Sequence, residues 1–131
     1  MPRHSKPAIS IDPINNVIRI HKSTLLLIGK PDYIQLLVNP SSMQIAIKAS
    51  NKDDYLAHHV RWHELSRSKS YQLHSQKLLE ELFKFNNDFN KQTTYRIYGD
   101  YYENEGVVKF DFNDAKAEKV KVINSGRIDN R

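Results

Sequence analysis

The stretch VIRIHKSTLLLIGKPDYIQLLVNPSSMQIAIK, residues 17–48, carries the pattern that decides the fold. At its start, Ile18 and Ile20 alternate with Arg19 and His21. Successive side chains of a strand point to opposite faces, so this alternation predicts a strand with one buried face and one polar face. We therefore expect Arg19 on the polar face.

The rest of the stretch predicts a short helix followed by two strands. Leu25–Ile28 supply the apolar side of one or two helical turns, Gly29 suits the left-handed position that ends a helix, and Pro31 prevents the helix from continuing. Tyr33–Val38 and Gln44–Lys48 are strand-like and are separated by a polar turn. The order strand, helix, strand, strand defines one β-α-β-β unit.

The same order returns in the second half of the chain. Ser70–His74 alternates like the first strand, and Lys77–Asn86 places its apolar residues at helical spacing. Thr93–Tyr98 and Val107–Phe112 are rich in β-branched and aromatic residues, with a polar turn predicted over Gly99–Gly106. The sequence therefore contains two β-α-β-β units.

The two units agree in the order of their elements rather than in residue identity. At an offset of 53 residues the strand at 18–21 aligns with 71–74, and at an offset of 61 residues 34–37 aligns with 95–98. A unit of about 35–45 residues cannot bury a core alone, so we expect the units to share one core. The predicted fold class is α+β and β-rich, one barrel with short helices about a pseudo-two-fold axis. The predicted divisions are an N-terminal arm (1–16), a first unit (17–50), a connector (51–69), a second unit (70–115) and a C-terminal tail (116–131).

The first unit resembles the swapped-hairpin domain of AbrB/SpoVT-type transition-state regulators. The resemblance rests on Val17–Ile20, Ser23–Gly29, Tyr33–Val38 and Gln44–Lys48, which follow the family's order of a strand, a short helix ending near a glycine, and a hairpin that closes with Ile-x-Ile. That family usually builds its barrel from two chains, and tandem versions such as MraZ proteins place two copies in one chain. The resemblance implies a swapped-hairpin barrel that acts in transcription regulation by binding DNA.

The chain departs from the family at positions near the first strand and helix. Family members commonly carry Gly-Arg before the first strand, a proline at its end and an arginine inside the helix. This chain has Asn15-Asn16 and His21-Lys22 at the two ends of the strand, and no arginine between Lys22 and Lys30.

Composition excludes several classes of protein. The 131 residues include no cysteine, which removes disulfide frameworks, thiolate nucleophiles and cysteine-ligated zinc. No apolar run approaches the roughly 20 residues of a membrane-spanning helix, and the basic N-terminus leads into no signal-peptide core. We expect a soluble, cytoplasmic protein.

The positive charge lies in the first half of the chain. Residues 1–70 hold ten basic and five acidic side chains, whereas residues 71–131 hold ten of each. A one-sided basic half is typical of a protein that binds a polyanion such as DNA, although a net charge of +5 is also ordinary for solubility. The DNA-binding candidates are Arg3, Lys6, Arg19, Lys22, Lys30 and Lys48, with Arg61, Arg67 and Lys69 from the connector. They would mostly contact phosphates of duplex DNA, and Arg19 would reach a base edge.

The residues with metal-binding or catalytic chemistry form no familiar site. His59 and His63 are four residues apart, next to His58 and Glu64, but the order is not the zinc-binding His-Glu-x-x-His and no second cluster follows. There is no glycine-rich phosphate loop and no nucleophile elbow. We expect no metal, no cofactor and no enzymatic activity.

A second reading of the sequence is a protein-interaction module, such as an antitoxin-like or inhibitor protein of a mobile element. Its surface would be the acidic, tyrosine-rich turn of the second unit, formed by Asp100, Tyr101, Tyr102, Glu103 and Glu105. The charge asymmetry favours DNA binding, and the missing family arginines favour the interaction module. Either reading fits a monomer or a homodimer.

Overall fold

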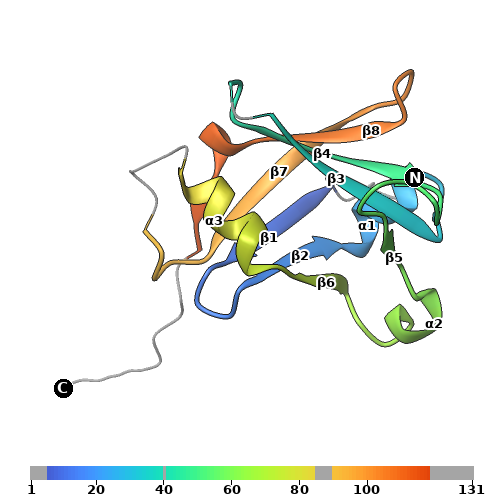
Figure 1. Ribbon diagram of the computed structural model, residues 1–131, viewed down its shortest axis with the longest axis horizontal. Coiled ribbons are helices and arrows are strands. Elements are labelled where there is room, and N and C mark those ends of the chain that lie inside the picture. Colours follow the sequence, from blue (N-terminus) through green and yellow to red (C-terminus); the bar gives the residue numbers. More distant parts are fainter. Residues whose placement is uncertain (1–5, 40, 85–89, 119–131) are drawn as a thin grey trace.

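The computed structural model describes residues 6–39, 41–84 and 90–118 (Figure 1). Its elements follow the chain in this order: β1 (Ala8–Asp12), β2 (Val17–His21), α1 (Lys22–Leu27), β3 (Tyr33–Asn39), β4 (Gln44–Ser50), β5 (His58–His59), α2 (Trp62–Leu65), β6 (Ser70–His74), α3 (Gln76–Lys84), β7 (Tyr95–Tyr102), β8 (Val107–Asp111), the 3-10 helix η1 (Phe112–Asp114) and β9 (Lys116–Ala117). None of the helices within these residues has the length and hydropathy needed to cross a membrane.

The strands form one curled antiparallel sheet in the order β5-β3-β4-β8-β7-β1-β2-β6 (Figure 1). Strand β7 joins its two parts, because residues 95–98 pair with β1 and residues 99–102 pair with β8. The short β9 pairs with the beginning of β7. The end strands β5 and β6 do not pair with each other, so the described sheet is a half-barrel with one open side.

The core fills the concave side of the sheet. Alternate residues of the strands point inward and are buried, as the period-two patterns predicted. Helix α3 covers one end of the sheet with Leu79, Leu82 and Phe83, and the Phe83 ring meets Phe112 edge to face at 6.4 Å between centroids. The largest fully buried side chains are Phe110, Phe112, Ile9, Ile11, Ile18, Ile20, Leu25, Ile34, Ile45, Ile47, Leu82 and Ile97.

The β-rich α+β class predicted from the sequence is confirmed, and strand, helix, strand, strand occurs in both halves as β2-α1-β3-β4 and β6-α3-β7-β8. The prediction of an irregular arm is wrong for residues 8–12, which form the buried strand β1 between β2 and β7. Pro7 and Pro13 flank this strand without interrupting it, because each lies just outside the ladder. Arg3 and the tail beyond Glu118 lie outside the described residues.

The second hairpin also differs from its prediction. The turn expected over Gly99–Gly106 is shorter, because β7 continues as a strand through Tyr102. Gly99 lies against the ring of Phe110, where an added Cβ would come within 2.6 Å of Phe110 Cδ2 and 2.7 Å of the Lys109 carbonyl oxygen. The glycine therefore permits close packing inside the strand rather than a turn.

The connector is more ordered than the irregular link the sequence predicted. It contains β5, which pairs with the beginning of β3, and the single-turn helix α2. Val60 is buried, and its N–H donates to the Asp32 carbonyl at 2.7 Å. The Trp62 indole Nε1 donates to the Pro31 carbonyl at 2.6 Å, so α2 is fastened to the turn that follows α1.

Candidate nucleic-acid interface

Strands β2 and β6 bring basic residues together at one end of the sheet. His21 lies opposite Ser70, and the Lys22 N–H donates to the Lys69 carbonyl at 2.9 Å, so the ladder continues one residue beyond the strands. Arg67 lies two residues before Lys69, in the turn after α2. We call Lys22, Arg67 and Lys69 the basic edge. None of the three forms an ion pair with any described residue.

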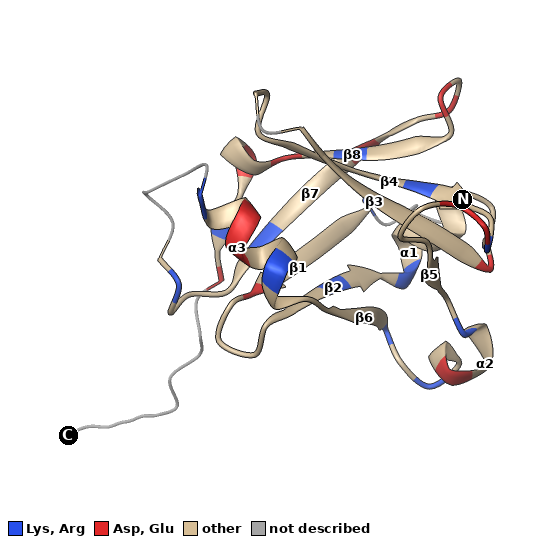
Figure 2. Ribbon diagram, viewed as in Figure 1, with Lys and Arg blue, Asp and Glu red and all other residues tan. Residues whose placement is uncertain are grey.

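The distribution of charge along the ribbon agrees with this grouping. Figure 2 shows basic positions along β2, at α1 and in the α2–β6 connection, whereas the turn between β7 and β8 carries acidic positions. Lys6, which is exposed, lies two residues before β1, and the first residue of β1 bonds to α1: the Ala8 N–H donates to Thr24 Oγ1 at 3.0 Å. Strand β1 therefore begins at the same end of the sheet as the basic edge.

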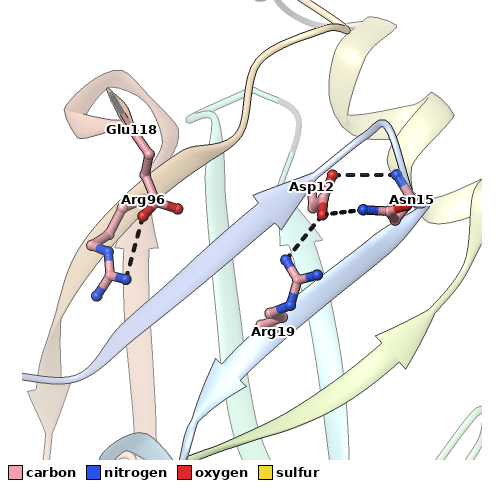
Figure 3. Close-up of polar contacts among 5 residues, drawn as sticks. All are labelled: Asp12, Asn15, Arg19, Arg96 and Glu118. Atoms are coloured by element: carbon pink, nitrogen blue, oxygen red, sulfur yellow. Dashed lines mark hydrogen bonds and ion pairs between the residues drawn. The ribbon is translucent and has the colours of Figure 1, made fainter. Parts of the chain in front are cut away.

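Arg19 is engaged in the fold rather than free for a ligand. Its Nη1 lies 3.1 Å from Asp12 Oδ2, and the Asp12 side chain is only 7% exposed (Figure 3). Asp12 also accepts hydrogen bonds from the Asn15 backbone N–H and side-chain amide. Burial raises the pKa of Asp12, but these bonds and the Arg19 guanidinium outweigh it and hold that pKa below 3.8. The guanidinium compensates a buried carboxylate.

A second arginine lies in the same cross-strand row. Arg96 faces Ser10, Ser10 faces Arg19, and Arg19 faces Gln72, so four strands align these side chains on the convex face. Arg96 Nη2 lies 3.4 Å from Glu118 Oε2 (Figure 3). Both arginines of the row therefore have a carboxylate partner. The row carries less uncompensated positive charge than its two arginines alone would give.

Two other predicted residues are not part of the basic edge. Lys48 is on β4, between Gln35 and Val107, in the other part of the sheet. Lys30 Nζ lies 5.4 Å from the centre of the Trp62 ring, which is cation–π distance. Of the nine residues predicted to bind DNA, the structure gathers Lys22, Arg67 and Lys69 at the basic edge, and Lys6 precedes the strand that begins at the same end of the sheet.

Arg61 lines a pocket of about 460 Å³ on the open side of the half-barrel. The pocket lies between the β5–α2 segment and the free edge of β6. Its lining residues are His59, Arg61, Glu64, Leu65, Tyr71 and Gln72. We call it the seam pocket.

The polar groups of the seam pocket are held by the fold but have few partners. Arg61 and Glu64 form no ion pair within the described part of the chain. The His59 ring stacks on Tyr33, with 4.7 Å between centroids and 15° between planes. Burial raises the pKa of the Tyr71 hydroxyl, and the nearby Arg61 charge partly opposes that rise. Sequence reasoning missed Tyr71 and Gln72, because only the pairing shows that β6 has a free edge.

The histidines are arranged differently from a metal site. His59 stacks on Tyr33, while burial lowers the pKa of the neighbouring His58, whose side chain faces a different hollow, beside α3. Across residues 6–39, 41–84 and 90–118, no group of three or more His, Asp or Glu is placed to hold a metal ion.

The rival surface is the tip of the β7–β8 hairpin. Tyr101 is 37% and Tyr102 41% exposed, and Asp100 lies opposite Lys109. Lys109 Nζ lies 4.5 Å from the centre of the Tyr102 ring and 3.1 Å from Glu105 Oε1. The tip also contains Glu103, in the turn. Lys109 compensates Glu105, whereas Asp100 and Glu103 are exposed without an ion pair among the described residues, so the tip is both acidic and aromatic.

Comparison of the chain with protein-family models, with curated proteins and with solved structures finds no match.

Proposed function

We propose that the chain is a small, non-enzymatic DNA-binding protein whose basic edge contacts the phosphates of duplex DNA. The observation that carries the proposal is the continuation of the β2–β6 ladder through Lys22 and Lys69, which groups cations from distant parts of the sequence. Lysine and arginine neutralise phosphates without reading sequence, so the contact would be dominated by charge. The proposal requires no cofactor.

The proposed contact differs from the sequence expectation in the role of Arg19. Because Arg19 compensates the buried Asp12, it is assigned to the fold and not to a base edge. The three residues of the basic edge, none of which has a carboxylate partner among the described residues, take over the contact with DNA.

A salt titration tests the proposal. Binding to a random DNA duplex should weaken as salt rises, with a slope of log K against log salt of about −0.9 for each phosphate neutralised. The double variant Lys22→Glu, Lys69→Glu should reduce the magnitude of that slope by about 2. The matched control is Lys77→Glu, Lys91→Glu, which makes the same charge change at α3 and the loop after it. Absence of binding at low salt, or equal effects of both variants, contradicts the proposal.

We also infer that the two halves are copies of one unit, arranged as in the swapped-hairpin barrel that the sequence resembles. Exchanging β1, β2, β3 and β4 with β5, β6, β7 and β8 reproduces six of the seven pairings among these strands. Arg19 and Gln72, which are counterparts at the 53-residue offset, lie directly opposite each other. A residue facing its own counterpart is expected at a pseudo-two-fold axis. This likeness in arrangement supports DNA binding by analogy only.

A second candidate function, protein interaction, is favoured by the exposed tyrosines of β7. Tyr98, Tyr101 and Tyr102 are 46%, 37% and 41% exposed on one hairpin. Tyrosine is enriched at binding hot spots. If the partner is a second copy of the chain, sedimentation equilibrium should show a dimer that the variant Tyr101→Ser, Tyr102→Ser dissociates. A wild-type monomer that binds duplex DNA supports the first candidate instead.

A further inference from the structure

The edge of β6 that borders the seam pocket leaves the main-chain groups of Gln72 unpaired with any described strand, whereas the Ser70 carbonyl on the same edge accepts from Ser68 Oγ at 3.0 Å. Two backbone hydrogen bonds just beyond the ends of β6 show which residues face β2. The Lys22 N–H donates to the Lys69 carbonyl, and the Ser75 N–H donates to the Asn16 carbonyl. Alternate residues of an antiparallel strand point the same way, so residues 69, 71, 73 and 75 face β2 and residues 70, 72 and 74 face the open edge. No described strand pairs with that edge. The main-chain N–H and C=O of Gln72 therefore point away from β2, beyond the edge of the sheet and beside the seam pocket.

The pocket lies at the place where the strand pairing of the two halves differs. The one pairing that the exchange of halves does not reproduce is β1–β2, whose counterpart would be β5–β6. A short turn joins β1 to β2, whereas β5 and β6 are separated by α2 and its flanking turns. The gap in the ladder is the seam pocket, lined by His59 on one side and by Tyr71 and Gln72 on the other.

The groups around the pocket match the parts of one nucleotide. The exposed His59 is already stacked on Tyr33, so a base that stacks on the imidazole would extend an existing stack. Arg61 offers a guanidinium with no described carboxylate partner, the geometry that suits a phosphate. Gln72 offers a donor and an acceptor from its main chain, and the Glu64 carboxylate can accept from an exocyclic amino group. The volume of about 460 Å³ lies within the usual range for small-ligand sites.

The pocket is also continuous with the basic edge. Gln72 follows Lys69, the residue just before β6, by three residues, a distance of about 10 Å. Arg67 lies between α2, which forms one wall, and Lys69. A nucleic-acid strand whose phosphates lie on the basic edge would therefore present a neighbouring nucleotide to the pocket.

We propose that the seam pocket binds one unpaired nucleotide, with the base stacked on His59 and the phosphate on Arg61. The chain then binds single-stranded nucleic acid more tightly than duplex, because a paired base must first be unstacked before it enters. This inference rests on the proposed function, since the basic edge supplies the neighbouring phosphate contacts.

The test compares three labelled 12-nucleotide probes by fluorescence anisotropy at one salt concentration: single-stranded DNA, single-stranded RNA of the same sequence and the DNA duplex. Single strands should bind about tenfold more tightly than the duplex. A difference between the DNA and RNA strands shows whether the pocket discriminates the 2′-hydroxyl, and either strand gaining over the duplex supports the proposal.

Variants separate the pocket from the basic edge. Arg61→Gln and His59→Ala should each lower single-strand affinity about fivefold to tenfold and change duplex affinity less than twofold. The control Arg67→Gln, on the basic edge, should weaken both probes alike. Arg61→Gln changes an exposed side chain, so it keeps the test valid if His59→Ala loosens β5.

Two results would overturn the pocket alone: equal affinity for single strands and duplex, or pocket variants that weaken both equally. Failure of every probe to bind at low salt would overturn the DNA-binding function together with the pocket. If the chain binds duplex DNA but shows no preference for single strands, the proposed function is still supported. Only the inference about the pocket is then wrong.

Discussion

The Asp12 carboxylate shows how one buried charge determines the role of an arginine. Its side chain is 7% exposed and has Arg19 and Asn15 as partners. A carboxylate in this position is stable only while its partners remain, because an uncompensated buried charge is costly. Arg19 therefore belongs to the stability of the β1–β2 hairpin.

Replacing Arg19 should separate stability from DNA affinity. Arg19→Met keeps much of the aliphatic stem but leaves Asp12 without its cation, and we expect a loss of about 1–3 kcal/mol in the free energy of unfolding. Urea denaturation measures the loss. Duplex affinity at low salt should change much less than in Lys22→Glu, Lys69→Glu. A large loss of duplex affinity in folded Arg19→Met would show that Arg19 contacts DNA.

The partly buried histidines make stability depend on pH. Burial, with a contribution from Arg96, lowers the pKa of His21 below 6.5, although Glu118 opposes the shift, and burial alone lowers the pKa of His58. The folded state therefore binds these protons less readily than the unfolded state, so stability is full above pH 6.5 and falls as the pH drops through the folded pKa values. The urea midpoint should decrease between pH 7.5 and 5.5.

Single substitutions identify the histidine responsible. In His21→Gln, part of the decrease in the urea midpoint should disappear, because one of the two shifted groups no longer titrates. The exposed His63 provides the control, His63→Gln. An unchanged pH profile in His21→Gln would show that other groups produce the decrease.

The sequence located individual residues on faces but could not supply their partners. Alternation placed Arg19 on the polar side of its strand, as observed. Its partner Asp12 lies in β1, whose flanking prolines predict an irregular segment, so the sequence alone predicts Arg19 to be a free cation. Whether the charge of Arg19 is compensated depends on which strand lies beside β2. The residues near Arg19 in the sequence do not determine that neighbour.

At the scale of elements, β7 is the strand on which both parts of the sheet depend. Its first half pairs with β1 and its second half with β8, and the change of partner occurs at Gly99. The Gly99 N–H donates to the Pro7 carbonyl at 2.9 Å, so the glycine also anchors the beginning of the described chain. No other residue type leaves room there for the Phe110 ring.

Gly99→Ala should therefore be destabilising. The added Cβ would meet Phe110 and a backbone carbonyl at under 3 Å, and such overpacking costs about 1–3 kcal/mol. The free energy of unfolding, measured in urea, gives the result. Gly106→Asn is the matched control, because that site has φ +68° and open space, and asparagine tolerates this conformation. Equal free energies of unfolding for Gly99→Ala and the wild type would contradict this prediction. They would mean that β7 and β8 move apart at little cost to make room for the Cβ.

Elements with a strong period were predictable, and short or unusually placed ones were not. The ranges of β2 and β6 agree with the sequence prediction, and β3, β4 and α3 agree within a few residues. Strand β5 has two residues and α2 has four, too few for any periodic pattern. Their positions are set by tertiary contacts such as the bond from Trp62 to the Pro31 carbonyl.

For the whole molecule, the sequence gives the distribution of charge along the chain but not which cations lie side by side. The excess of basic residues in the first half does converge in part, because β2 and β6 pair and align Lys22 with Lys69. Lys48 belongs to the same half but lies on β4, away from that edge. The seam pocket could not be predicted, because it arises from a missing strand pairing.

The crossing of strands between the halves has a consequence for genetic dissection of the protein. Four pairings, β1–β7, β2–β6, β3–β5 and β4–β8, join residues before position 51 to residues after it. A fragment ending in the 51–57 loop would expose most of its apolar surface and stay unfolded by circular dichroism. Mixed with the complementary fragment, it should regain β structure, as in a split reporter. Independent folding of either fragment would show that the halves are autonomous after all.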